Sequence, residues 1–218
     1  MQMRRQFLKT SFGSLIGMGI LFSPVFEMVR KAYAKAQKKI LPKDVNREKL
    51  IYRNPALLDT RKLEPTPLKN FRTMGDSNYS VDLSDWHLEV TGRVATPLRL
   101  AYSQILTLSS IERDVLLICP GFFANHGRWK GISMKMLLEK AQMQTGVTHL
   151  IFSAAGGAGG NEAKFPLADI QSDRVFLAYG VNSVTLPKKH GFPLRLVAEG
   201  YHGSVWVKYV NRIRLDRS

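Results

Sequence analysis

The chain has 218 residues, a hydrophobic content of 44% and a formal net charge of +15 at pH 7. This length is enough for one sizeable core, and the hydrophobic content excludes wholesale disorder. The only cysteine is Cys119, which excludes an intrachain disulfide framework and any metal site built from several thiolates.

The positive charge is uneven along the chain. Residues 1–34 hold five basic and one acidic residue, residues 35–72 hold eleven and four, and residues 73–218 hold sixteen and twelve. The last and longest part interleaves no basic residues with aromatic ones along one strand or helix face. We therefore expect no nucleic-acid partner, in spite of the net charge.

Residues 1–34 read as a targeting segment. Arg4 and Arg5 open the string RRQFLKT, an apolar stretch follows over residues 12–29, and small residues close the segment at residues 32–34. A basic head, an apolar middle and a small-residue exit are the three parts of an export signal. The string resembles a twin-arginine translocation signal, which implies periplasmic export of a protein that folds first, often around a cofactor.

Three charged residues near the exit, Glu27, Arg30 and Lys31, are unusual in such a signal. They leave open an uncleaved leader that stays as an N-terminal membrane anchor. Residues 35–70 are polar, charged and interrupted by four prolines, which indicates a basic arm, extended and solvated, with at most one short helix.

A domain is expected over residues 71–218. Its first half predicts a half-buried strand over 84–92, a strand end and short helix over 98–108, a buried strand over 114–119, and a helix over 133–141 with Met136, Leu137 and Leu138 inward. Its second half predicts strands over 149–152, 175–179, 194–197 and 205–215 and a glycine loop over 154–160. Many short strands and few short helices predict a mixed α+β fold.

Cys119 ends the predicted buried strand and precedes Pro120 and Gly121. A cysteine in this setting is most often a small buried apolar residue. A nucleophile paired with a histidine and a ligand to a soft metal are the functional alternatives. His126, His190 and His202 are all candidates for the paired base.

A second candidate site is the string HGFPLR, from His190 to Arg195, followed by residues 200–208 with Lys208 at the end. Its glycines allow main-chain N–H groups to approach an anion, and arginine with lysine suits a phosphate ester. The ordinary alternative is a hairpin whose charges are solvated.

The chain at this point resembles the molybdopterin domain of the sulfite oxidase family, over about residues 71–215. The resemblance rests on several strings in the family's order: Phe71-Arg72, Val90-Thr91-Gly92, Cys119, Trp129-x-Gly131-Ile132, Ala178-Tyr179-Gly180, Leu186-Pro187, HGFPLR and Val207-Lys208. It implies a mixed β-sheet, barrel-like domain with short helices that binds one molybdenum-molybdopterin.

The resemblance also implies roles for individual residues. Cys119 would be the thiolate ligand of molybdenum, beside the two dithiolene sulfurs of the pterin. The implied cofactor contacts are Phe71, Arg72, His190, Arg195, Trp206, Val207 and Lys208.

Two departures from the family concern the substrate. Sulfite oxidases carry an arginine pair soon after the cysteine, whereas this chain has PGFFANH over residues 120–126. The bacterial periplasmic branch that includes the methionine sulfoxide reductase catalytic subunit, nearest in size and leader, has an acidic residue where this chain has Gly121. Phe122 and Phe123 would give either an apolar mouth or core packing.

The sequence thus predicts an exported molybdopterin oxidoreductase that transfers an oxygen atom, reducing a small-molecule or protein-bound S-oxide or N-oxide. The chain shows no haem or flavin motif, so a separate membrane partner, a b-type cytochrome or a quinol-linked protein, is the expected electron donor. The alternatives are a sulfite-type dehydrogenase and a non-catalytic cofactor-binding or interaction domain that kept the fold.

Overall fold

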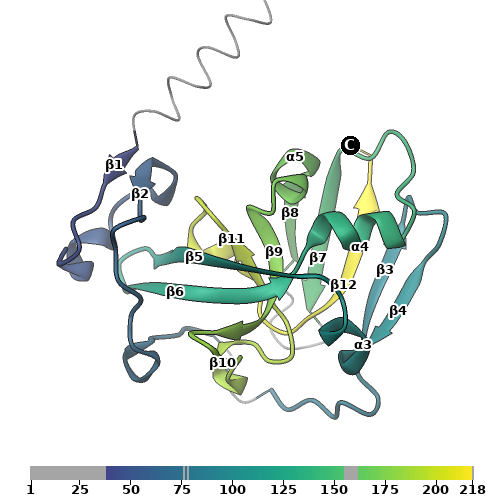
Figure 1. Cartoon of the computed structure of the whole chain (residues 1–218), viewed down its shortest axis with the longest axis horizontal. Helices are drawn as coiled ribbons and strands as arrows, with labels where there is room; N and C mark the ends of the chain where they lie inside the picture. The colour runs from purple at the N-terminus through teal and green to yellow at the C-terminus, as the bar shows by residue number, and fades with distance from the viewer. Residues whose placement is uncertain (1–37, 76, 78, 155–161, 218) are drawn as a thin grey trace, which may run out of the picture. The chain divides into compact units, whose positions relative to one another are not determined.

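The computed structural model describes residues 38–75, 77, 79–154 and 162–217 (Figure 1). The predicted targeting segment and nearly all of the predicted glycine loop lie outside these residues. The chain divides into a unit of residues 1–39 and a unit of residues 40–218, and the second is described here. In the described part, no helix is long and apolar enough to cross a membrane.

Two five-stranded sheets form most of the second unit. The first contains β5 (Ser110–Cys119), β6 (Phe123–Ile132), β9 (Val175–Val181), β10 (Val184–Thr185) and β11 (Arg195–Ala198). Its neighbours are all antiparallel, and β9 pairs with β6, β10 and β11. The β5–β6 hairpin is its longest feature and crosses the view in Figure 1.

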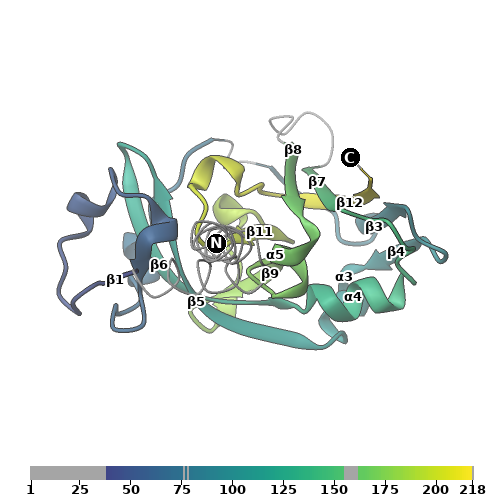
Figure 2. The ribbon, with the colours of Figure 1, turned by 90° about the horizontal axis from the view of Figure 1, so that it is seen from above.

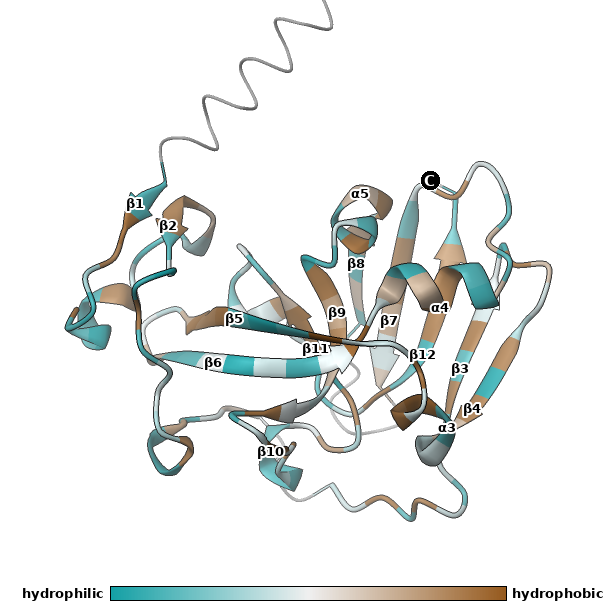
Figure 3. Cartoon of the chain, in the orientation of Figure 1, coloured by the Kyte–Doolittle hydropathy of each residue, from teal (hydrophilic) through white to brown (hydrophobic). Residues whose placement is uncertain are grey.

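The second sheet has the order β4-β3-β12-β7-β8. Its strands are β3 (His87–Gly92), β4 (Leu98–Ala101), β7 (His149–Ala154), β8 (Glu162–Pro166) and β12 (Val210–Asp216). Only β12 and β3 run parallel. Hydrophobic and hydrophilic bands alternate along β3 and β4 in Figure 3, as expected of strands with one face on the core. A separate two-stranded ladder joins β1 (Lys39–Ile40) to β2 (Leu58–Asp59).

The helices are short. They are α3 (Tyr102–Leu106), α4 (Met134–Lys140) and α5 (Leu167–Gln171), with 3-10 turns η1 (Arg47–Leu50), η2 (Pro55–Leu57), η3 (Leu68–Asn70), η4 (Lys188–His190) and η5 (Gly203–Val205). In α4 the buried side chains are Met134, Leu137 and Leu138, whereas Met136 is 44% exposed. The prediction that Met136 faces inward is wrong, because the buried stripe starts at Met134 and repeats at helical spacing.

The predicted α+β fold, with mixed sheets and short helices, is confirmed as a mostly β domain whose strands curl around the core (Figure 2). One large cluster of buried side chains joins both sheets. The sequence reading missed β6 as a full strand, because its residues 123–128 carry polar and small side chains in place of an apolar run.

Residues 40–70 are packed on the domain, so the expectation of an extended and solvated arm is wrong for them. Four buried leucines, Leu41, Leu50, Leu58 and Leu63, form a second cluster with Leu116, Ile118 and Ala124 of the β5–β6 hairpin. Main-chain bonds add to this contact: the Thr66 N–H donates to the His126 carbonyl, and the Gly121 N–H donates to the Ile51 carbonyl. The segment therefore packs against the β5–β6 hairpin, whose first strand ends in Cys119.

The last strand begins later than predicted, at Val210 in place of Val205. Residues 203–205 form η5, and Tyr209 has a left-handed φ of 58°. An extended strand cannot run through such a residue. The break leaves residues 203–209 as a loop beside β5.

Candidate functional site

Cys119 lies at the last position of β5. Residues 115–118 before it are buried, and the turn after it is closed by the Phe122 N–H donating to the Cys119 carbonyl. Gly121 in this turn has a φ of 77°, a conformation that favours glycine. The hairpin thereby holds the thiol half-buried at the end of a rigid strand.

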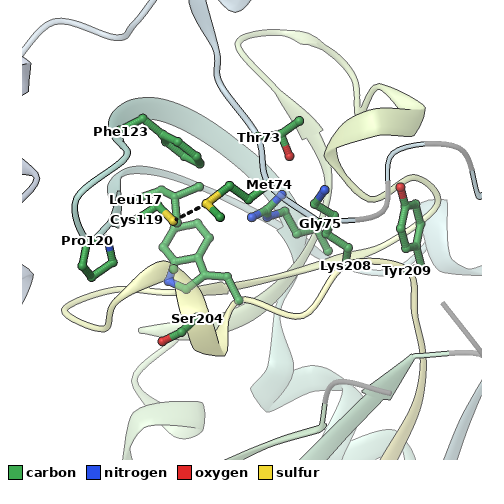
Figure 4. Close-up of a pocket in the computed structure, with 13 residues that line it drawn as sticks. Thr73, Met74, Gly75, Leu117, Cys119, Pro120, Phe123, Ser204, Lys208 and Tyr209 are labelled. Atoms are coloured by element: carbon green, nitrogen blue, oxygen red, sulfur yellow. Dashed lines mark hydrogen bonds between the residues drawn. The ribbon is translucent and has the colours of Figure 1, made fainter. Parts of the chain in front are cut away.

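A cavity of about 330 Å³ opens beside this thiol (Figure 4). Its lining residues are Thr73, Met74, Gly75, Leu117, Cys119, Pro120, Phe123, Arg195, Gly203, Ser204, Trp206, Lys208 and Tyr209. The Cys119 thiol donates a hydrogen bond to the Met74 thioether over an S–S distance of 3.2 Å, and the two sulfurs face each other in Figure 4. Three separate segments of the chain, residues 73–75, 117–123 and 195–209, therefore converge on one cavity.

Arg195 supplies a buried cation to this cavity. Its side chain is 5% exposed, and its guanidinium carbon lies 5.8 Å from the ring centres of both Trp129 and Trp206. One terminal N–H donates to the His190 carbonyl at 2.9 Å, but the buried Nε finds no partner in the part of the chain that the structure describes. No carboxylate of the described residues forms an ion pair with it, and burial lowers the pKa of Arg195 to about 10. A buried, unpaired guanidinium is costly unless an anion compensates it.

His190 is buried behind the cavity. Burial is the main cause that lowers the pKa of His190 to about 4, and the charge of Arg195 adds to it, so the ring is neutral at pH 7. Among the residues described, its Nε2 has no hydrogen-bond partner. Gly191, next to it, has a φ of 109°, and a Cβ there would meet Lys208 and Arg195 at 3.1–3.3 Å. The glycine thus lets the two basic residues approach the turn closely.

The thiol of Cys119 does not belong to a Cys–His pair in the described structure. Its hydrogen bond goes to Met74, and burial raises its pKa, with Arg195 acting in the opposite direction. His126 is fully buried and faces the Glu64 carbonyl through Nδ1. The nucleophile alternative therefore lacks a low pKa, and the printed hydrogen bond of the thiol goes to a thioether in place of a histidine.

The predicted site residues divide into three groups. Cys119, Arg195, Trp206 and Lys208 line the cavity together. Phe71, His190 and Val207 are buried next to it without lining it: the Phe71 ring packs against Trp129 and, edge to face, against His190. Arg72 lies elsewhere, exposed on a second cavity.

Sequence reasoning missed several lining residues. Ser204 lies within residues 200–208, which the sequence analysis singled out, and Tyr209 directly follows them. Their position near the site could be predicted from the sequence, but their place in the cavity lining could not. Met74 carried no sequence signal, because a lone methionine in a polar stretch has no motif. Its place beside Cys119 follows from the path of residues 71–75 across the end of β6, where Asn125 bonds the Arg72 main chain in both directions.

The donor set fits a phosphate-bearing, metal-carrying group. Cys119 provides a thiol to the cavity, and Arg195 and Trp206 line the same space. Within the described residues, Nε of Arg195 and Nε1 of Trp206 have no hydrogen-bond partner. In the described ranges, no three His, Cys, Asp or Glu side chains cluster to hold a metal ion. A metal bound at Cys119 would therefore take its remaining ligands from the group itself.

Comparisons with known proteins agree with this geometry. Residues 75–218 match the family described as the oxidoreductase molybdopterin binding domain. The chain is 29% identical over 189 residues to the NADH nitrate reductase of Lotus japonicus, covering 73% of this chain and 21% of that protein. It is 32% identical over 145 residues to the protein-methionine-sulfoxide reductase catalytic subunit of Gluconobacter oxydans (strain 621H), covering 60% and 46%.

Among solved structures, the sulfane dehydrogenase SoxCD from Paracoccus pantotrophus superposes with a TM-score of 0.60 at 24% identity, covering 64% of this chain and 40% of that one. This similarity shows a common fold. The chain spans between a fifth and a half of the lengths of these proteins. The matched family, the common fold and the cavity at Cys119 together establish that the chain belongs to the sulfite oxidase family of molybdopterin-binding oxidoreductase domains.

Proposed function

We propose that this protein is an exported oxygen-atom transferase that reduces an S-oxide or N-oxide at a molybdenum-molybdopterin held beside Cys119. The observation that carries the proposal is the pairing of one half-buried thiol with a buried, uncompensated guanidinium in a single cavity. When bound, the group supplies two-electron oxygen-atom transfer. The residues of the chain hold it, orient it and shape the space for the substrate.

Each basic residue has a separate task in this proposal. Arg195 would bind the anionic end of the group through its Nε and compensate its own buried charge by doing so. Lys208 lines the same cavity and would add a second cation. Cys119 would give up its proton on metal binding, because the ligand is the thiolate and the raised pKa keeps the free thiol protonated at pH 7.

The apolar wall of the cavity supports a thioether or its oxide as the reacting group. Leu117, Pro120 and Phe123 line the cavity together with the thiol, and the wall includes the Met74 thioether, which bonds the thiol directly. The absence of basic residues in the turn over residues 120–123 argues against sulfite, because that oxyanion needs cations next to the reacting centre. The sulfoxide reductase relative supports the same substrate class.

Export and the electron source rest on the sequence. The paired Arg4 and Arg5 before an apolar stretch support twin-arginine export to the periplasm, with or without cleavage of the leader. The domain brings no redox motif beyond the molybdopterin site, which supports a separate membrane partner, a b-type cytochrome or a quinol-linked protein, as the electron donor.

The test uses full-length protein purified from a host that makes molybdopterin. We expect about one molybdenum per chain, and turnover of a methyl aryl sulfoxide with reduced viologen as electron donor. Sulfite with ferricyanide is the opposing assay. Faster sulfite oxidation than sulfoxide reduction would refute the proposed direction, and protein that stays free of molybdenum would refute the cofactor.

A further inference from the structure

A second cavity lies on the other side of the Cys119 turn, and the catalytic proposal does not use it. It has a volume of about 510 Å³, and its lining residues are Arg47, Glu48, Ile51, Thr66, Asn70, Arg72, Gly121, Phe122, Phe123, Ala124 and Asn125. Phe123 lines both cavities, and the turn contributes Pro120 to the first and Gly121 to the second. We call this space the Arg47–Arg72 cavity. It is a direct neighbour of the thiol site.

The two arginines of this cavity have no carboxylate partner among the residues that the structure describes. Arg47 donates through one terminal nitrogen to the Glu64 carbonyl at 2.7 Å, while its buried Nε has no partner within the described ranges. The Arg72 main chain is fixed by Asn125, but no bond to another described residue holds its exposed guanidinium. One carboxylate, Glu48, also lines the cavity, so the lining carries two positive charges and one negative charge.

The remaining walls carry no charge and mix apolar with polar side chains, the polar ones being Thr66, Asn70 and Asn125. The side chains of Ile51, Phe122, Phe123 and Ala124 supply the apolar surface, and Phe122 is 53% exposed. Phe122 lines this cavity together with Arg47 and Arg72, which have no carboxylate partner among the described residues. The cavity surface therefore has an apolar part and a cationic part. Such a surface matches a ligand that is itself apolar with a single anionic group.

We propose that the Arg47–Arg72 cavity binds the carboxylate of an otherwise apolar small molecule, and that this molecule is the substrate whose S-oxide group enters the neighbouring thiol cavity. The claim that the bound molecule is the substrate rests on the proposed function. It narrows the substrate from any S-oxide to an S-oxide that bears a carboxylate. Arg47 comes from residues 40–70, outside the matched family region of residues 75–218, so this specificity is supplied by this chain's own N-terminal segment.

Binding is measured first on protein purified without molybdenum, by titration calorimetry with two probes that differ only in the carboxylate. These are 4-(methylsulfinyl)benzoate and methyl phenyl sulfoxide. We expect the carboxylated probe to bind about ten-fold more tightly, as one charge-assisted interaction gives. Raising the salt concentration should reduce this preference, because the guanidinium groups are accessible to solvent.

Variants locate the site. Arg47→Gln and Arg72→Gln should each remove most of the preference for the carboxylated probe, and Glu48→Gln should increase it. Arg53→Gln is the matched control, an exposed arginine of the same segment that lines neither cavity. Arg72→Gln carries little risk to folding, because the side chain of Arg72 makes no bond within the described structure. Equal binding of both probes by the wild type, or an equal loss in Arg53→Gln, would overturn the proposal.

The loaded enzyme then separates this inference from the proposed function. If both hold, KM for 4-(methylsulfinyl)benzoate rises about ten-fold in Arg72→Gln, while kcat and the KM for methyl phenyl sulfoxide stay unchanged. Carboxylate binding without turnover of either sulfoxide would keep the cavity as an anion site and reject the proposed reaction. Turnover of both sulfoxides with equal KM in the wild type would keep the reaction and reject the cavity.

Discussion

Replacing Arg195 with methionine should have opposite effects on the free protein and on cofactor binding. Methionine keeps most of the side-chain volume and removes the charge. In the free protein the lowered pKa, from 12.5 to about 10, corresponds to a cost of about 3 kcal/mol for keeping the guanidinium charged. The substitution relieves this cost.

The substitution also removes favourable contacts. The hydrogen bond to the His190 carbonyl is worth about 1–2 kcal/mol, and the contacts of the guanidinium with Trp129 and Trp206 are worth about 0.5–1 kcal/mol each. Gain and loss nearly cancel, so we expect the free energy of unfolding of the free protein to change by no more than about 1 kcal/mol. Cofactor affinity should fall by about 2–4 kcal/mol, because a charge-assisted bond to the anionic group is lost.

Urea unfolding of protein purified without cofactor measures the first effect, and pterin fluorescence after oxidation measures the second. Arg212→Met, at an exposed arginine of β12, is the control and should change neither. A loss of 3 kcal/mol or more in the free Arg195→Met protein would show that the guanidinium is a structural group. Wild-type pterin content in the variant would show that Arg195 does not bind the cofactor.

Three other perturbations have defined outcomes. Replacing Arg4 and Arg5 with lysine should leave the folded protein in the cytoplasm, as cell fractionation would show, and an unchanged periplasmic yield would contradict twin-arginine export. His190 has a folded pKa of about 4, below the value of 6.5 in the unfolded chain, so its contribution to stability is complete above pH 6.5 and falls by about 3 kcal/mol as the pH drops toward 4. Urea unfolding across this range checks the slope, which His190→Gln should flatten. Gly131→Ala would place a methyl group 2.1 Å from the Leu177 carbonyl oxygen and should cost about 3 kcal/mol of unfolding free energy, whereas a loss below about 1 kcal/mol would mean that the two strands separate easily there.

The sequence predicted the residues of the Cys119 cavity better than its surroundings. The local pattern at Cys119 is most typical of a small buried apolar residue, and the string from His190 to Lys208 also fits a hairpin with solvated charges, so the family resemblance was what selected both. The structure brings Cys119, Arg195, Trp206 and Lys208 to one cavity, as the family resemblance implies. Cys119 and residues 195–208 are distant in the sequence, so the order of the family's strings, and no local pattern, was what placed them together.

Residues 40–70 were the main failure, because their structure depends on a distant partner. Four leucines in this polar and proline-rich stretch show no helical or strand period. They share a surface only because all four pack on the face of the β5–β6 hairpin that carries Leu116, Ile118 and Ala124. The family resemblance implied that Phe71 and Arg72 both contact the cofactor, yet Arg72 lines the second cavity and Phe71 is buried in the core. Tertiary contacts of this kind leave no local pattern.

The most direct test of the central claim is to count the sulfur ligands of molybdenum by X-ray absorption in the wild type and in Cys119→Ser. The variant should fold and keep much of its pterin, because the basic residues proposed to bind it come from residues 190–208. With Cys119 as the protein ligand, the wild type should show three sulfur ligands and the variant two, together with loss of sulfoxide reduction. An unchanged sulfur count with wild-type turnover in Cys119→Ser would show that Cys119 is a buried core thiol and that the metal is held elsewhere.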